Sequence, residues 1–502
     1  MATSSSAPHA VSAGNGPLLD VAQLLLPAIR WDDERGYEAH RPAIERALEL
    51  GVGGFIFFGG TTDAAAALTA ELHERSRIPL LIGADLERGA GQQFRGLTGL
   101  PPLAALGALG DQRILRRAAS ITAREARSVG VNWVYAPDCD LDLLPDNPII
   151  GTRSLGGDPE IVSELASEWI DACQSAGALA CAKHFPGHGR TLGDSHMELP
   201  VVDASREELH RQDLEPFRWA VDAGVASVMT AHVSYPALDP SGAPATHSAR
   251  ILGELLREDR GFDGLIVTDA MIMDGILEGQ DEREASVRAL EAGCDLLLYP
   301  SDLESVARAI ARAVEERRLS MELVMRAAER RTRWAEWAGR TEVKPVDDAD
   351  WRWAADICER VVHSLGDPVP SIGPRPELAI VDDDLGGPYP APSRQPFVDA
   401  LTELGHAPVM VEEPDELGGA PLVVALFGDI RSWKGRPGYS DESKARVRAF
   451  LDAAAARDAP AVVVQFSHPR LARELGKVPA LLCAWGGEAV MQAAAARKLV
   501  GR

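Results

Sequence analysis

Short apolar runs recur through the first 300 residues, at a spacing of roughly thirty residues, and polar or amphipathic stretches separate them. Runs of this length, bounded by turn residues, are typical of buried β-strands. We count eight of them. They are Leu24–Ile29, Gly53–Phe58, Leu80–Asp85, Asn132–Ala136, Leu179–Lys183, Ser227–Ala231, Leu265–Thr268 and Asp295–Tyr299.

Helical patterns lie between these runs. They are Arg41–Leu50, Asp111–Val129, Pro159–Ala176, Arg206–Ala223, Ser248–Arg257 and Asp281–Ala292. Eight strands that alternate with helices predict an α/β fold of the (β/α)8, TIM-like barrel type. An open doubly wound sheet would show the same alternation. The count of eight favours the barrel without deciding between the two.

A second, shorter alternation follows Pro300. After helical patterns at Leu303–Arg317, Met321–Ala338 and Trp351–Leu365, five strand patterns alternate with four helical ones up to residue 502. This predicts a smaller, flavodoxin-like α/β domain. No GxGxxG motif occurs there, so the sequence gives little support to nucleotide binding. We expect a disordered tail at 1–17, the barrel with trailing helices at 18–340, a linker at 341–376 and the C-terminal domain at 377–502.

Composition narrows the function classes. The chain has 502 residues, which suits two cores, and a formal net charge of -24. Nucleic acid and anionic membranes need a basic face, so neither is expected as a partner. Six cysteines occur without a CxxC pair, so neither a zinc ribbon nor a disulfide framework is predicted. The N-terminus lacks a signal-peptide pattern and no apolar run is long enough for a membrane span, so we expect a cytoplasmic protein.

The most informative segment is Lys183–His196, KHFPGHGRTLGDSH, which follows the fifth strand pattern. It contains three histidines, a lysine and an aspartate within fourteen residues. A buried core seldom tolerates so many titratable groups. Asp194 and His196 are two residues apart, so in an extended loop both side chains can point the same way. An aspartate beside a histidine suits proton transfer, because it fixes the tautomer and raises the proton affinity.

Other strand ends add carboxylates and cations at the same edge of the predicted barrel. Asp85 ends the third strand, Arg153 lies in the loop after the fourth, and Asp269 follows the seventh. Carboxylates combined with cationic donors and a proton shuttle are the groups that sugar chemistry needs. Asp269 is the candidate nucleophile, because a lone carboxylate at the end of an apolar strand is costly unless it is solvated or used.

Each of these residues also has a structural interpretation. A strand-end aspartate is more often a helix cap or turn residue, and Asp194 has that alternative too. His184 and His188 could pack the loop, and for His188 we favour this. Arg153 and Lys183 could be ordinary ion-pair partners. The alternating aspartates after the fourth strand pattern fit one face of a strand or turn better than a cation site. They are Asp138, Asp140 and Asp142.

These motifs carry a family resemblance, which spans residues 18–302. The segment 183–200 is similar to the KHFPGHG…DSH…LP signature of the beta-N-acetylhexosaminidases of glycoside hydrolase family 3, and 136–154 resembles their AP…NPxIGxRSF element. The resemblance implies that Asp269 is the nucleophile, and that His196 is the general acid/base with Asp194 as its partner. It further implies a sugar-binding role for four residues. They are Asp85, Arg153, Lys183 and His184.

The chain departs from the family pattern in three places. The SDD-like nucleophile motif is Thr268-Asp269-Ala270 here, and the DQEGG-like element is Asp85-Leu86-Glu87-Arg88-Gly89. Both keep the functional aspartate and change its neighbours. Arg190 occupies a loop position that is often acidic or small, so the preference for the leaving group stays open.

The resemblance implies a retaining glycosidase that releases terminal β-linked N-acetylglucosamine from peptidoglycan or chitin fragments and needs no metal or organic cofactor. It leaves open a β-glucosidase or broad β-glycosidase of the same family, and a phosphorylase that uses phosphate instead of water. A catalytically inactive sugar-binding protein is the alternative from another class. The expected partner is a small carbohydrate, and the chain could be a monomer or a homodimer. A role in peptidoglycan recycling would follow.

Overall fold

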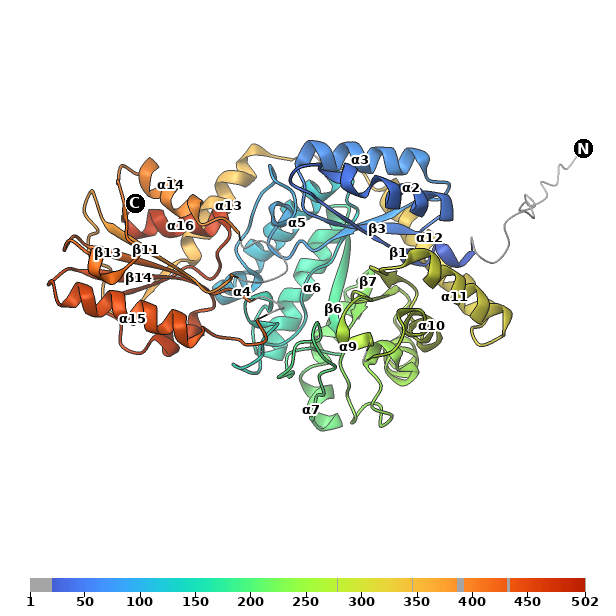
Figure 1. Cartoon of the computed structure of the whole chain (residues 1–502). Coiled ribbons are helices and arrows are strands. Elements are labelled where there is room, and N and C mark those ends of the chain that lie inside the picture. Colours follow the sequence, from blue (N-terminus) through green and yellow to red (C-terminus); the bar gives the residue numbers. More distant parts are fainter. Residues whose placement is uncertain (1–19, 278, 345, 386–391, 431–433, 502) are drawn as a thin grey trace, which may run out of the picture.

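The computed structural model describes residues 20–501 except 278, 345, 386–391 and 431–433 (Figure 1). The predicted tail at 1–17 lies outside the described residues. The first half is built on parallel strands whose order follows the sequence. They are β1 (Leu25–Leu26), β2 (Ala28–Arg30), β3 (Gly54–Phe58), β4 (Leu81–Ala84), β5 (Trp133–Val134), β6 (Leu179–Phe185), β7 (Ser227–Thr230), β8 (Leu265–Thr268) and β9 (Leu297–Leu298).

The strands close into a ring. Strands β2 to β8 pair side by side in one seven-stranded sheet, and β9 continues it through a parallel bridge between Val267 and Leu296. Strand β9 in turn pairs with β1, which directly precedes β2 in the chain. The predicted barrel is therefore confirmed, and the open sheet is wrong. The predicted strand Leu24–Ile29 is divided at Pro27, because proline has no amide hydrogen to donate to a neighbouring strand.

Helices cover the outside of the barrel (Figure 1). They are α2 (Arg41–Leu50), α3 (Thr62–Arg75), α4 (Leu103–Leu109), α5 (Gln112–Ser128), α6 (Pro159–Ser175), α7 (Arg206–Arg211), α8 (Glu215–Asp222), η5 (Arg250–Asp259), α9 (Asp274–Leu277), α10 (Glu282–Ala292), α11 (Leu303–Glu315) and α12 (Met321–Arg340). The next helix, α13 (Asp348–Val361), packs against α4 of the barrel and against α16 (Ala489–Leu499) of the second half. The predicted helix Arg206–Ala223 is two helices. The chain breaks between α7 and α8, where the buried carboxylate of Asp213 accepts hydrogen bonds from Arg190.

The second half forms a six-stranded sheet in the order β10-β15-β14-β13-β11-β12. Its strands are β10 (His363–Leu365), β11 (Glu377–Asp382), β12 (Val409–Met410), β13 (Leu422–Phe427), β14 (Ala461–Phe466) and β15 (Leu481–Cys483). The five parallel strands follow the order 2-1-3-4-5, which is the flavodoxin-like order. Strand β10 is antiparallel at the edge. The prediction placed these three residues at the end of a helix, which in fact ends at Val361.

Helices α14 (Gln395–Glu403) and α16 (Ala489–Leu499) lie on one side of this sheet and α15 (Asp441–Ala455) on the other (Figure 1). The two halves share apolar packing. Ala104 and Ala105 of α4 belong to the same buried cluster as Phe397, Phe427 and the neighbouring strand residues. A helix of the barrel therefore packs into the core of the second sheet.

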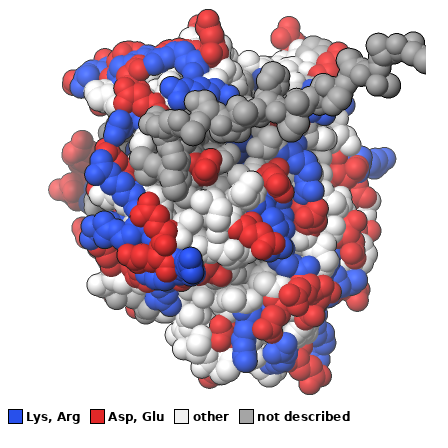
Figure 2. All heavy atoms as spheres, turned by 90° about the vertical axis from the view of Figure 1, so that its right-hand side faces the viewer, with Lys and Arg blue, Asp and Glu red and all other residues white. Residues whose placement is uncertain are grey.

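The surface of the protein carries charges of both signs (Figure 2), and its cysteines are buried thiols. Figure 2 shows acidic and basic side chains interspersed on the face of the barrel that it draws. All six cysteines are buried and free, so none is paired in a disulfide. Among the described residues, no helix is long and apolar enough to cross a membrane.

Closure of the barrel generates a stability prediction. Leu26 of β1 is fully buried at the point where β1 meets β9. Leu26→Ala should lower the free energy of unfolding by about 2–5 kcal/mol, because it removes buried methyl groups and leaves a cavity. Urea unfolding followed by circular dichroism measures this change. Met325→Ala, on an exposed part of α12, is the control and should change stability by less than about 0.5 kcal/mol. Equal stability of the two variants would contradict the prediction.

Candidate active site

The carboxyl ends of the barrel strands collect charged side chains. Asp85 follows β4, Lys183 and His184 lie near the end of β6, and Asp269 follows β8. Lys183 and His184 are adjacent in the chain, yet both side chains take part in this cluster. Successive residues of a regular strand point to opposite faces. The pairing of β6 with β7 shifts register between Ala182 and Phe185, and this irregularity allows both side chains to reach the site.

Lys183 forms the buried centre of the cluster. Its side chain is 1% exposed, and its Nζ atom lies 2.8 Å from Asp85 Oδ1 and 2.8 Å from Glu87 Oε1. Burial alone would lower the pKa of Lys183, but the two carboxylates raise it above its usual value. The ammonium therefore stays charged, as it must to hold two anions together.

Arg153 binds the other side of Glu87. The residue belongs to the short helix η3 (Gly151–Arg153), and its Nη2 and Nε atoms donate to Glu87 at 2.9 Å and 3.1 Å. This is the bidentate geometry that guanidinium and carboxylate groups favour. Burial would raise the pKa of Glu87, but Arg153 and Lys183 hold it well below its usual range. Glu87 is therefore an ionised bridge between two cations.

His184 is a neutral histidine with a fixed tautomer. Burial and the neighbouring Arg153 lower its pKa to about 4, and burial raises the pKa of Asp140 to about 6. Near pH 7 the ring is neutral and Asp140 is largely ionised, so Nδ1–H donates to Asp140 Oδ2 at 2.7 Å. The Nε2 atom then accepts from Arg153 Nη2 at 3.4 Å.

Asp138, Asp140 and His184 form the group of described residues whose donor atoms could surround a metal ion, within 4.8 Å of one another. Most of these atoms already have partners, although Asp138 Oδ2 accepts no hydrogen bond from the described residues and lies 3.6 Å from Arg153 Nη2. Asp140 accepts from the amides of His184 and His188 as well as from the His184 ring, and Asp138 accepts from the amide of Asp140. Burial and the adjacent Asp140 raise the pKa of Asp138. These hydrogen bonds indicate that Asp138 and Asp140 hold His184 and its loop in place.

Asp269 is an ionised carboxylate among histidine rings. One oxygen accepts the amide of Ala270 at 2.7 Å, and the other lies 3.9 Å from His184 Nε2. Burial would raise its pKa, but His184, His232 and His196 lower it well below the usual value. The side chain is 19% exposed. An accessible carboxylate that stays ionised is suited to nucleophilic attack and not to proton donation.

The Asp194–His196 pair supplies a proton carrier. His196 Nδ1 lies 2.7 Å from Asp194 Oδ1, and the same oxygen accepts the backbone amide of His196. Burial would lower the pKa of His196, but the bond to Asp194 and the charges of Asp194 and Asp269 raise it above 6.5. The His196 side chain is 39% exposed whereas Asp194 is 2% exposed. Nε2 is thus the ring atom free to exchange a proton.

The loop that carries this pair is anchored on two sides. His188 lies with Nε2 2.9 Å from Ser195 Oγ and Nδ1 2.8 Å from Thr191 Oγ1, and burial lowers its pKa to about 3. On the other side, the amide of Gly275 donates to Ser195 O at 3.0 Å. A Cβ atom at Gly275 would lie 2.5 Å from that oxygen, so this close approach requires glycine.

The structure brings all seven predicted site residues to one end of the barrel and into one connected set of contacts and charges. They are Asp85, Arg153, Lys183, His184, Asp194, His196 and Asp269. Sequence reasoning missed Glu87, Asp140 and His232 as parts of this set. Each lies in a segment at the end of a predicted strand, and this position was the only feature of the sequence that could have indicated a role in the site. Arg190 is bound to Asp213, which is a structural role.

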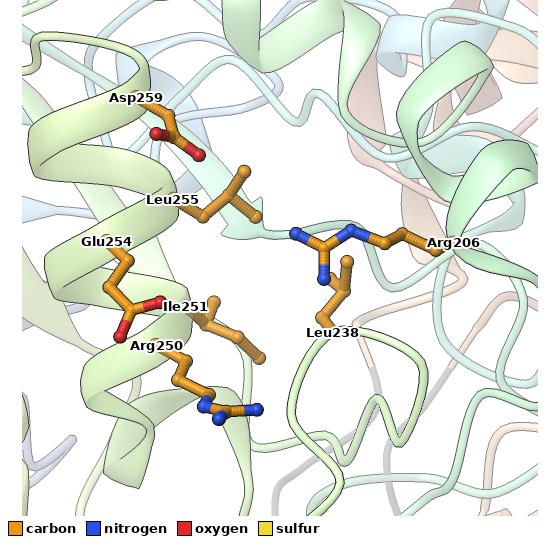
Figure 3. Close-up of a pocket in the computed structure, with 7 residues that line it drawn as sticks. All are labelled: Arg206, Leu238, Arg250, Ile251, Glu254, Leu255 and Asp259. Carbon is orange, nitrogen blue, oxygen red and sulfur yellow. The ribbon is translucent and has the colours of Figure 1, made fainter.

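A separate hollow lies on the outside of the barrel, between η5 and the side chains of Arg206 and Leu238 (Figure 3). Its charged side chains are exposed. None of the site residues lines it, so it is not part of the strand-end site. Its lining residues are Arg206, Leu238, Arg250, Ile251, Glu254, Leu255 and Asp259.

Comparisons with known proteins agree with this arrangement. A beta-hexosaminidase of Thiobacillus denitrificans is 39% identical over 308 residues, which cover 59% of this chain and 81% of that protein. A beta-N-acetylglucosaminidase/beta-glucosidase of Cellulomonas fimi is 38% identical over 264 residues, covering 51% of this chain and 47% of that protein.

The fold of the whole chain also has solved counterparts. The structure of a glycoside hydrolase family 3 beta-N-acetylglucosaminidase from Paenibacillus sp. FPU-7 matches with a TM-score of 0.84 and 29% identity, covering 97% of each chain. A structure described as the beta-glucoside phosphorylase BglX has a TM-score of 0.81 at 22% identity, covering 98% of this chain and 92% of that one, and shows the fold alone.

The model of the glycosyl hydrolase family 3 N-terminal domain matches residues 20–333, which is more than half of the chain and contains every site residue described above. The chain therefore belongs to glycosyl hydrolase family 3, and it is a glycosidase.

Proposed function

We propose that this glycosidase hydrolyses terminal β-linked N-acetylglucosamine with retention of configuration, through a covalent glycosyl-Asp269 intermediate. The observation that carries the proposal is the Asp194–His196 pair. It provides a proton carrier on the barrel itself, within electrostatic reach of an ionised carboxylate. The two groups supply the acid and the nucleophile that a retaining mechanism needs.

In the first step, an Asp269 oxygen attacks the anomeric carbon and the bond to the leaving oxygen breaks. The protonated Nε2 of His196 gives its proton to that oxygen, so the aglycone departs as a neutral alcohol. Asp194 holds the imidazolium before transfer and fixes the tautomer that remains afterwards. The product of this step is a sugar ester of Asp269 and a neutral His196.

In the second step, a water molecule attacks the same carbon from the side that the aglycone has left. Neutral His196 Nε2 accepts a proton from the water, the bond to Asp269 breaks, and the carboxylate is restored. Two displacements at one carbon retain the configuration. The enzyme returns to its starting protonation state, because His196 regains the proton that it donated.

The sugar would be held by the cluster beside Asp269. Asp85 and Arg153 remain 30% and 18% exposed, so their polar atoms can reach hydroxyl groups. Lys183 and His184 are almost fully buried. Lys183 contacts Asp85, and His184 contacts Arg153. We propose that all four define the pocket for the terminal sugar, with the two buried residues setting the charge and position of the others.

The preference for N-acetylglucosamine is drawn from the relatives, whose names are beta-hexosaminidase and beta-N-acetylglucosaminidase. Fragments of peptidoglycan or chitin carry this sugar at a terminal position and are the proposed natural substrates. Phosphate is a second acceptor to test, because a neutral histidine admits an anion more readily than a second carboxylate would.

Release of p-nitrophenol from the N-acetylglucosaminide and from the glucoside tests the substrate. We expect the larger kcat/KM for the N-acetylglucosaminide, and faster turnover of the glucoside would contradict the proposal. The same assay on a muropeptide fragment, with and without phosphate, tests the acceptor. Free N-acetylglucosamine is the expected product in both conditions, whereas sugar phosphate would identify a phosphorylase.

Asp269→Ala tests the nucleophile. We expect kcat to fall by about a thousandfold or more, because no other carboxylate takes its place. The circular dichroism spectrum should remain that of the wild type. Substantial residual hydrolysis by the folded variant would show that another group attacks the sugar.

His196→Ala tests the acid. The loss of kcat/KM should reach about a hundredfold or more for alkyl glycosides, whose leaving group needs a proton, and should be much smaller for p-nitrophenyl or dinitrophenyl glycosides. A series of leaving groups of different pKa measures this dependence. Equal losses across the series would exclude an acid role for His196.

Asp194→Asn tests the pairing through the pH profile. His196 must be protonated in the first step, so kcat/KM falls as the pH rises through the pKa of His196. Asp194 raises that pKa, and removing its charge should move the alkaline limb to lower pH by about one unit. An unchanged alkaline limb would separate Asp194 from the proton transfer.

A further inference from the structure

The second sheet presents the carboxyl ends of its strands to the barrel. Asp429 follows β13, Arg470 follows β14 and Glu488 follows β15. All three side chains form ion pairs with barrel residues, because Asp429 and Glu488 bind Arg88 and Arg470 binds Asp142. Parallel strands end at one edge of a sheet, which is where flavodoxin-like domains bind their ligands. Here that edge is directed at the loops after β4 and β5.

Asp429 lies at the centre of these contacts. Its Oδ2 atom is 2.8 Å from Arg88 Nη1, and its Oδ1 atom accepts from Thr152 Oγ1 at 3.4 Å. Arg88 Nη2 also donates to Thr152 Oγ1 at 3.1 Å. The Asp429 side chain is 4% exposed and that of Arg88 12%. One carboxylate of the second sheet thus holds two loops of the barrel at once.

The two residues that Asp429 holds are the direct neighbours of a pair in the site. Arg88 follows Glu87, and Thr152 precedes Arg153. Glu87 and Arg153 form the bidentate ion pair beside Lys183. The loops that carry them, residues 85–102 and 135–158, contain little regular structure of their own beyond two short 3-10 turns. Contacts from outside are therefore needed to fix where Glu87 and Arg153 stand.

We propose that Asp429 is a positioning residue for sugar binding, which acts through Arg88 and Thr152 on the Glu87–Arg153 pair. The C-terminal half then contributes to the reaction indirectly, by fixing the two barrel loops that carry Glu87 and Arg153. This inference rests on the proposed function, since it assigns the sugar pocket to the cluster around Glu87. A displacement of about 1 Å in such a pocket is enough to change rates strongly.

Asp429→Asn tests the inference, because it keeps the shape of the side chain and removes the charge that binds Arg88. The matched control is Asp350→Asn. Asp350, on α13, is also 4% exposed and also binds two arginines of the barrel, Arg117 and Arg124, but these lie on the outer helix α5. The measurements are KM and kcat for p-nitrophenyl N-acetylglucosaminide, the inhibition constant of N-acetylglucosamine, and the melting temperature.

We expect Asp429→Asn to raise both KM and the inhibition constant by about tenfold, with a smaller change in kcat. Asp350→Asn should lower the melting temperature and leave KM and the inhibition constant within about twofold of the wild type. If Asp429→Asn does not fold, Thr152→Val replaces it. This variant removes the hydroxyl that joins Asp429 to the η3 turn, and it should raise the inhibition constant in the same direction.

Unchanged KM and inhibition constants in folded Asp429→Asn would overturn the positioning role and leave the proposed function standing. Equal increases in Asp429→Asn and Asp350→Asn would also overturn it, because they would show a general effect of loosening the two halves. A wild-type enzyme that hydrolyses neither the N-acetylglucosaminide nor the glucoside would overturn the proposed function, and the positioning role with it.

Discussion

Glu87 shared between Lys183 and Arg153 is the interaction on which the site depends. Two cations taken out of water carry a large desolvation cost, and their attraction to one carboxylate offsets it only in good geometry. The structure provides that geometry, with contacts of 2.8 Å and 2.9 Å. Because the three groups come from the β4 loop, the η3 turn and strand β6, their pairing draws separate parts of the barrel rim together.

The histidines of the site have different tasks because their surroundings differ. His184 and His188 are enclosed, and burial keeps both rings neutral, so they act as fixed hydrogen-bonding groups. His196 lies in the same motif but is partly exposed and hydrogen-bonded to Asp194. It therefore holds a proton more strongly than a free histidine. Sequence spacing alone does not separate these roles. Burial and the identity of the partner do.

Strand periodicity favoured the barrel over an open sheet, because eight buried parallel strands produce eight nearly continuous apolar runs, but only the pairing of β9 with β1 decides between the two. The same alternation predicted a flavodoxin-like architecture for the second sheet, whose strand order is seen only in the structure. The edge strand at 363–365 was missed because it has only three residues, of which none is buried. The break at Asp213 was missed because the local pattern is helical throughout, and the pairing of Asp213 with Arg190 is visible only in the structure.

The site residues were predicted where a motif concentrates them, as in Lys183–His196. Glu87 and Arg88 show the limit of this approach. Both stand in the predicted segment after β4, yet their roles are set by partners 66 and 341 residues away. Charge pairing across such separations leaves no local pattern in a single sequence. Only the folded arrangement reveals which of several strand-end carboxylates bridges two cations and which arginine faces the second sheet.

The close contact between Gly275 and Ser195 has a consequence for how sequences of this kind can diverge. The segment that follows Asp269, the proposed nucleophile, and the segment that carries His196, the proposed proton donor, are joined there by main-chain atoms. The distance between these two segments thus depends on the absence of a side chain at position 275. A side chain can change at an exposed neighbour such as Met197 without disturbing this contact, whereas any residue larger than glycine at position 275 would push the two segments apart.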